Sequence, residues 1–223
     1  MQISRNFLSS IIVSAVVLGL SGVSQAQLIA PTFSTTGALA GNQGWGGSLG
    51  TYFTVTGSFL LRDIGVFDSD ANGFASGTTL NVAIFTQAGV QVTTTQTFTQ
   101  GSPGSLGAGS YRFKSLPGGD LTLNTGNYAI VAQGFNDNDK NYNSFGVGSS
   151  INVGYFDFQG SNLAFGQSYY GIASTLELPA LGGDPADRFG AGVFTVMIPE
   201  PGTLALLGLG LAPIALVIRR RRK

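Results

Sequence analysis

The chain contains neither histidine nor cysteine, and these two absences remove most common enzymatic chemistry. Ser-His-Asp triads, cysteine nucleophiles and histidine-bound metals each need one of these residues. Without cysteine there are no disulfides either, so folding depends on a hydrophobic core. Carboxylate chemistry remains, and a glycoside hydrolase would need two acidic residues facing one cleft. The candidates in the aromatic C-terminal half are Asp157, Glu177, Asp184 and Asp187. The alternative interpretation is that these residues are ordinary acids of loops and turns. We therefore do not expect an enzyme.

Charged residues are also scarce, at 10% of the chain. Between residues 27 and 198, five basic residues stand against ten acidic ones, which gives this segment a net charge of minus five. The formal charge returns to zero only through the basic residues near the two chain ends. An acidic segment with dispersed lysine and arginine lacks the basic surface that holds phosphate backbones, so we expect no nucleic-acid partner.

The residues that are abundant favour an all-β fold. Short runs rich in Thr, Val, Phe, Tyr and Ile alternate with clusters of Gly, Asn, Asp, Ser and Pro, which is typical of a β-sandwich or barrel. The pattern predicts strands over Tyr52–Thr56, Phe59–Phe67, Thr79–Thr86, Val90–Thr97, Ser110–Leu116, Asp120–Leu123, Asn127–Gln133, Ile151–Phe158 and Ala191–Met197. Gln87-Ala88-Gly89 predicts a hairpin turn, because Gly89 tolerates a positive φ. Between Gln159 and Arg188 the pattern weakens, and it predicts long loops with at most short strands.

The two ends of the chain predict export and membrane anchoring. Arg5 precedes an apolar stretch, and Ser24-Gln25-Ala26 supplies the small residues that signal peptidase accepts, so residues 1–26 form a predicted signal peptide cleaved after Ala26. An apolar run from Leu204 to Ile218 is followed by a terminal basic cluster. Clustered charges stay on the cytoplasmic side of a membrane, so we expect a C-terminal transmembrane helix with a cytoplasmic C-terminus. Residues 27–198 would then form one exported β-sandwich domain.

The C-terminal segment has three parts in a fixed order. Pro199-Glu200-Pro201 comes first, the apolar run follows, and Arg219, Arg220, Arg221, Arg222 and Lys223 close the chain. Together, residues 199–223 closely resemble the PEP-CTERM sorting signal of Gram-negative bacteria. This resemblance implies processing by an exosortase, an integral-membrane protease that cuts near Pro-Glu-Pro, with transient inner-membrane anchoring before delivery to the cell surface or the extracellular space. The alternative is a simple tail anchor with an accidental Pro-Glu-Pro.

A second resemblance covers about Gly50 to Phe135. Its main segments are Leu61-Arg62-Asp63-Ile64-Gly65-Val66-Phe67-Asp68, Asn81-Val82-Ala83-Ile84-Phe85 and Leu121-Thr122-Leu123-Asn124-Thr125-Gly126-Asn127-Tyr128. They are similar to β-sandwich domains of uncharacterised function carried by many PEP-CTERM proteins. The resemblance implies a jelly-roll-like sandwich and no particular chemistry.

One loop has the pattern of a calcium site. Asp68-Ser69-Asp70-Ala71-Asn72-Gly73 matches the first half of an EF-hand loop, with oxygen donors at alternate positions and a glycine at the sharp turn. Thr79 stands where the bidentate glutamate belongs, so an intact EF-hand is excluded. A non-helical Ca²⁺ loop using Asp68, Asp70 and Asn72 is the hypothesis, and a turn with Asx hydrogen bonds is the alternative. Residues 136–139, Asn-Asp-Asn-Asp, form a similar but vaguer cluster.

Aromatic residues suggest a carbohydrate-binding alternative. Trp45, Tyr155, Tyr169 and Tyr170 occur among Gly, Asn, Gln and Ser, and sugar rings stack on aromatic faces flanked by amides. Aromatic residues in an all-β chain are also core residues, so both interpretations stay open. The main expectation is an exported structural or adhesive protein of the cell surface or extracellular polysaccharide matrix. The alternative is a glycan-binding module, with or without calcium.

Overall fold

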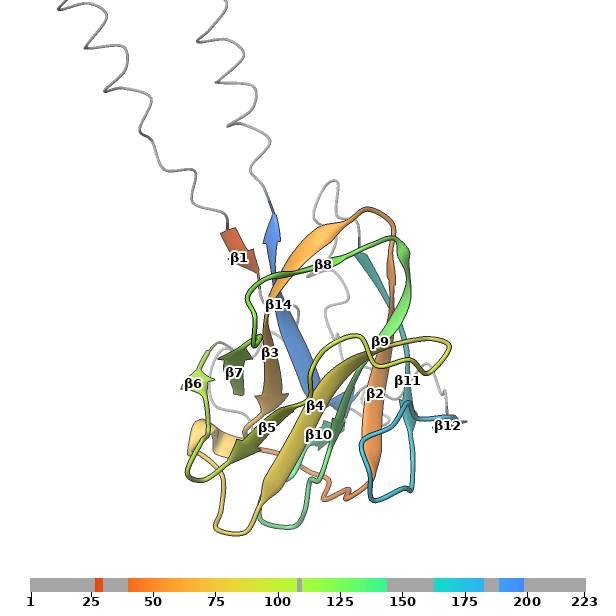
Figure 1. The fold of residues 1–223 in the computed structure, drawn as a ribbon. Helices are drawn as coiled ribbons and strands as arrows, with labels where there is room; N and C mark the ends of the chain where they lie inside the picture. Colours follow the sequence, from red (N-terminus) through yellow and green to blue (C-terminus); the bar gives the residue numbers. More distant parts are fainter. Residues whose placement is uncertain (1–26, 30–39, 108–109, 144–162, 183–188, 199–223) are drawn as a thin grey trace, which may run out of the picture. The chain divides into compact units, whose positions relative to one another are not determined.

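The computed structural model describes residues 27–29, 40–107, 110–143, 163–182 and 189–198, and within these ranges the chain is all-β. Six strands form one sheet in the order β12-β11-β2-β9-β4-β5. A second sheet has the order β1-β14-β3-β7-β6, with β8 also paired to β3, and β10 and β13 form a small ribbon (Figure 1). The strands are β1 (Gln27–Ile29), β2 (Ser48–Val55), β3 (Phe59–Phe67), β4 (Thr79–Thr86), β5 (Gln96–Thr99), β6 (Ser105–Leu106), β7 (Tyr111–Ser115), β8 (Leu121–Leu123), β9 (Gly126–Gln133), β10 (Tyr142–Asn143), β11 (Leu163–Tyr170), β12 (Leu181–Gly182), β13 (Phe189–Gly190) and β14 (Gly192–Ile198).

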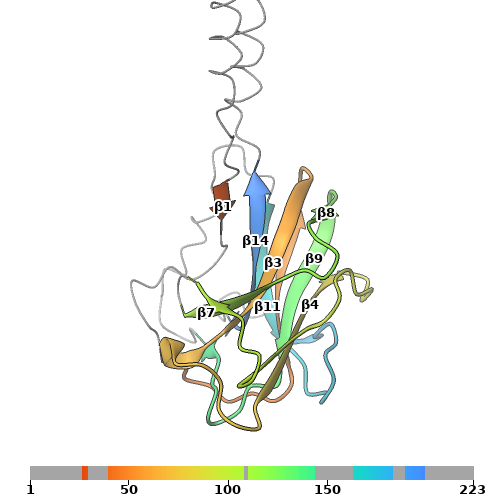
Figure 2. The ribbon, with the colours of Figure 1, turned by 60° about the vertical axis from the view of Figure 1, so that its left-hand side comes forward.

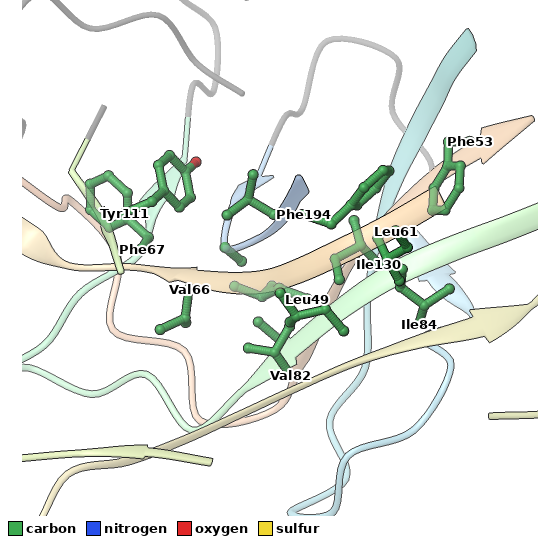
Figure 3. Packing of buried hydrophobic residues seen from close by; sticks show 14 of the residues in the cluster. Leu49, Phe53, Leu61, Val66, Phe67, Val82, Ile84, Tyr111, Ile130 and Phe194 are labelled. Atoms are coloured by element: carbon green, nitrogen blue, oxygen red, sulfur yellow. The ribbon is translucent and has the colours of Figure 1, made fainter. Parts of the chain in front are cut away.

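The two large sheets pack face to face around an aromatic core. Phe194 of β14 is fully buried, and its ring lies 4.9 Å from that of Phe53 on β2 and 6.2 Å from that of Phe59 on β3. Alternate residues of the facing strands fill the space between the sheets, as Figure 3 shows for Val82, Ile84 and Ile130. Residues 28–198 form one compact unit. The core therefore spans both sheets, and it makes the domain independent of disulfides.

Side-chain hydrogen bonds at a β-bulge in β3 link three strands of the second sheet. The register between β14 and β3 shifts between Phe194 and Val196. At this irregularity, the Asp63 carboxylate accepts hydrogen bonds from Ser115 Oγ on β7 and Thr195 Oγ1 on β14, both at 2.8 Å. Thr195 Oγ1 also accepts the Asp63 backbone N–H. The side chains replace ladder bonds that the bulge interrupts.

A lysine bridges the two large sheets at one lateral edge. Lys114 of β7 extends to edge strand β5, where its ammonium group donates to the Thr97 carbonyl and to Ser102 Oγ. The ammonium also lies 4.8 Å from the centre of the buried Phe98 ring, in a cation–π contact. Partial burial lowers the pKa of Lys114. A lysine held against an edge strand also opposes pairing with another chain.

The register places the loops at two opposite ends of the sandwich. Met197 pairs with Leu60, and Val55 pairs with Gly126, so residues 56–58, 87–89 and 124–125 lie at the end where β14 finishes. We call this the tail end. Ser48 pairs with Gln133, and Gly192 with Val66, so residues 40–47, 68–78 and 134–141 lie at the other end, which we call the loop end. Figures 1 and 2 show β14 finishing toward the top of the sandwich and the connection between β3 and β4 at its bottom.

The all-β prediction is confirmed, and two strands match their predicted bounds. β3 and β4 begin and end as predicted, and Gly89 adopts φ +85° in the predicted turn. The prediction for Val90–Thr97 was wrong in its bounds, because the strand β5 begins only at Gln96. The weak segment 159–188 contains the eight-residue strand β11, which the sequence pattern did not reveal. The strand predicted at 151–158 lies outside the described residues.

Candidate functional site

The candidate calcium loop lies at the loop end, and its first acid is already engaged. Asp68 is fully buried, and its carboxylate accepts the Gly73 backbone N–H at 3.0 and 3.1 Å. Arg112 Nε of β7 donates to Asp68 Oδ2 at 2.5 Å. The guanidinium therefore occupies one of the positions from which a cation could contact this carboxylate. No local sequence pattern indicates this partner, because Arg112 lies 44 residues from Asp68.

The other two predicted calcium ligands do not converge on Asp68 as an acidic set. Asp70 is exposed and accepts a hydrogen bond from Ser69 Oγ, while Asn72 is exposed at the end of the short 3₁₀ turn η1 (Ser69–Ala71). Within the described residues, no group of three acidic side chains has metal-binding spacing. The turn is instead strained, because Asp70 and Ala71 have φ of +62° and +55°. These contacts favour a structural role for Asp68, and calcium binding stays a prediction.

The second acidic cluster, residues 136–139, is tied to the same loop. Asn136 Oδ1 accepts the backbone N–H groups of residues 138 and 139, which forms an Asx turn. Asp139 is buried, and its carboxylate accepts the Ala75 N–H at 3.0 Å. Asn136 Nδ2 donates to Thr78 Oγ1. The loop end is therefore an interlinked polar surface built from segments that are distant in sequence.

The predicted glycan-binding aromatics are divided between two faces. Trp45 and Tyr170 pack against the main core, with their rings 5.4 Å apart and perpendicular, and Trp45 Nε1 donates to the Gly171 carbonyl. Tyr169, the neighbour of Tyr170 in the strand, lies on the opposite face of the sheet against Tyr52, with ring centres 4.6 Å apart. Tyr155 lies outside the described residues. These side chains do not form one platform, and Tyr52 was not among the predicted residues.

The outer face of the first sheet carries a small apolar cluster that the chain itself covers. Ala83, Phe85, Ala129 and Val131 are buried there. Leu176 and Leu178 of the segment between β11 and β12 pack on them, together with Tyr52. Partial burial, with a further contribution from Tyr169, raises the pKa of Tyr52. Glu177 of the same covering segment is exposed. The remaining glycosidase candidates, Asp157, Asp184 and Asp187, lie outside the described residues.

The predicted membrane and sorting segments also lie outside the described residues. The signal peptide with Ala26, the apolar run and the motif residues Pro199, Glu200, Pro201, Arg219, Arg220, Arg221 and Arg222 are all in this group. Among the residues that the structure does describe, none forms a helix of the length and apolar character needed to cross a bilayer. The described part of the tail region ends with β14 at Ile198.

Comparison with known families identifies the C-terminal segment. Residues 198–223 match the family model for the PEP-CTERM protein-sorting motif, which confirms the resemblance seen in the sequence. The motif begins at the last residue of β14. It implies export and sorting by an exosortase-like system. A search of curated proteins finds no match to the chain.

Proposed function

We propose that this PEP-CTERM protein is a structural or adhesive protein that is delivered to the cell surface or the extracellular polysaccharide matrix. The observation that carries the proposal is the junction at Ile198. The sorting motif starts where the last core strand ends, so the tail can be removed without removing a described core residue. A domain that is detached from its anchor and still folded is what surface delivery requires.

The chemistry of the junction supports cleavage at this point. Pro199 and Pro201 lack a backbone N–H, so they cannot extend the β14 ladder. A segment that cannot form ladder bonds is accessible to a protease active site. The apolar run and the terminal arginines would hold this segment at the membrane surface with the C-terminus in the cytoplasm. Signal peptidase would cut after Ala26 at the other end.

The body of the domain suits a passive mechanical role. Its two sheets enclose a continuous aromatic core, and the loop end is tied by hydrogen bonds between segments up to 101 residues apart in sequence. At the tail end, Ser58 Oγ donates a hydrogen bond to Asn124 Oδ1 and links the loop before β3 to the loop after β8. Such cross-links restrict loop motion, and rigid polar surfaces resist non-specific aggregation.

The test is the intact mass and cell fraction of the mature protein in its native host. In the native chain we expect a product without residues 1–26 that ends near Pro199–Pro201 and is recovered outside the membrane fraction. With Pro199, Glu200 and Pro201 replaced by alanine, the chain should retain residues 219–223 and stay in the membrane. Pro117→Ala, an exposed proline in a body turn, is the matched control and should be processed normally. A native product that retains residues 219–223 would refute the proposal.

A specific feature favours glycan binding as a second candidate function. Tyr52 and Tyr169 form a half-exposed pair, and the Tyr169 hydroxyl is within 2.9 Å of Gln167 Oε1 on the exposed part of β11. An aromatic face beside an amide is the usual arrangement for sugar stacking. We expect Tyr169→Ala to reduce retardation of the protein in gels that contain matrix polysaccharide. Gln87→Ala, in an exposed turn, should leave the mobility unchanged.

A further inference from the structure

The first and last strands of the described residues, β1 and β14, lie next to each other in the second sheet. β14 finishes at Ile198, immediately before the sorting motif, and β1 starts at Gln27, immediately after the predicted signal cleavage site. Figures 1 and 2 show the two strands running in opposite directions, so Gln27 and Ile198 lie at the same end.

We infer that, while the sorting tail is anchored, the sandwich stands on the bilayer with its tail end against the lipid headgroups and its loop end pointing away. This inference rests on the proposed anchoring by the tail. In this orientation, the tail end faces the lipid and the loop end faces the exterior. Residues 56–58, 87–89 and 124–125 meet the lipid surface, and residues 40–47, 68–78 and 134–141 are presented to the exterior.

The register fixes which loops belong to each surface. β3 pairs with β14 in antiparallel fashion from Leu60 opposite Met197 to Val66 opposite Gly192. Leu123 of β8 lies opposite Phe59, and Gly126 of β9 lies opposite Val55. The loops that follow these positions therefore lie beside the end of β14. β2 runs for eight residues between the two ends, so the surfaces are separated by about 25 Å.

The charge distribution supports the same orientation independently. Among the residues that the structure describes, the three loops of the tail end contain only Thr, Gly, Ser, Gln, Ala and Asn, so these loops carry no charge. The loop end carries the carboxylates of Asp68, Asp70, Asp137 and Asp139 against the cations of Arg112 and Lys140. An anionic lipid surface repels an acidic one. The described loops of the tail end can therefore approach such a surface without charge repulsion, whereas the acidic loop end is repelled by it.

The absence of cysteine allows a direct test with single labels. Thr56→Cys labels the tail end and Asn138→Cys labels the loop end, and both positions are exposed. Each full-length variant carries a fluorophore and is reconstituted into anionic liposomes with headgroup spin-labelled lipid as quencher. Because the two sites are separated by about 25 Å, we expect quenching at Thr56→Cys to be at least about threefold stronger. Gln87→Cys and Asn72→Cys form a second pair, so the result does not depend on one variant folding.

Liposome flotation separates the two ways of failing. Chains that float, with stronger quenching at the tail end in both pairs, support the inference. Chains that float, with equal or stronger quenching at the loop end, overturn the orientation and leave the proposed anchoring intact. Chains that do not float show that the tail does not anchor the domain, and this outcome overturns both the proposed function and the orientation.

Discussion

Replacing Asp68 with asparagine tests whether this acid is structural. The Asp68 side chain is fully buried and that of Arg112 is only 15% exposed. The substitution leaves the guanidinium without a counter-charge and places an amide near it. Removing one partner of a buried pair costs about 3–5 kcal/mol. Because Arg112 retains some solvent contact, we expect the free energy of unfolding to fall by about 3 kcal/mol.

Urea unfolding of the full chain in detergent, followed by Trp45 fluorescence, measures this loss. Arg112→Met and the double variant complete a thermodynamic cycle with Asp68→Asn. The double variant removes both charges, so its loss should be clearly smaller than the sum of the single losses. Ser115→Ala is a control for general loss of a polar contact, and it should cost about 1 kcal/mol.

Two results would refute the structural assignment of Asp68. One is a loss below about 0.5 kcal/mol in Asp68→Asn, which is the size of an ordinary surface substitution. The other is a rise in the urea midpoint of the native chain on adding calcium, abolished in Asp68→Asn. In that case calcium would displace Arg112 and the sequence-based hypothesis would hold. If Arg112 fills the site, calcium should stabilise Arg112→Met more than the native chain.

Three further outcomes follow from the core, the turns and the surface. Phe194→Ala should lower the free energy of unfolding by about 3–5 kcal/mol, measured by urea denaturation, because the ring is fully buried between Phe53 and Phe59. Gly134→Ala should lower the melting temperature much more than Gly118→Ala in thermal unfolding. Both glycines have positive φ, but only at Gly134 would the added Cβ lie 2.2 Å from the Thr79 carbonyl oxygen. The hydrogen bond from Arg62 lowers the pKa of Asp120, so this pair stabilises the folded chain above the pKa of an unfolded aspartate, and the gain disappears as the pH falls through the lowered value. Arg62→Gln should flatten this small acid-side dependence in pH-dependent unfolding.

The sequence predicted those strands that are rich in β-branched and aromatic residues. β3 and β4 were located correctly, with turn residues or polar residues at their borders. β11 was missed because Gly166 and Ser168, which are typical of turns, and the polar Gln167 interrupt its apolar residues where the register shifts. The threonine-rich segment before β5 favours a strand by propensity. There, Gln91 instead donates to the Thr93 carbonyl and to Thr95 Oγ1 in local bonds.

In the candidate sites, too, contacts that depend on neighbouring residues could be predicted, and contacts between distant residues could not. Tyr169 and Tyr170 are adjacent in sequence, and adjacent residues of a strand point to opposite faces. Their separation could therefore have been predicted once β11 was known. The Asp68–Arg112 pair could not, because no local pattern links residues 44 positions apart. A motif with carboxylates at alternate positions is compatible with calcium and with a buried ion pair, and only the tertiary partner distinguishes them.

The position of the sorting motif is constrained by the core of the sandwich. Val196 is buried and Phe194 lies at the centre of the aromatic cluster, so a cut only three residues before Pro199 would remove Val196 from the core. A motif placed many residues downstream would leave a long unpaired extension on the released domain. Placing Pro199 directly after β14 avoids both outcomes, because a proline cannot extend the strand beyond Ile198. The boundary between the folded body and the disposable tail therefore follows from packing as well as from recognition by the protease.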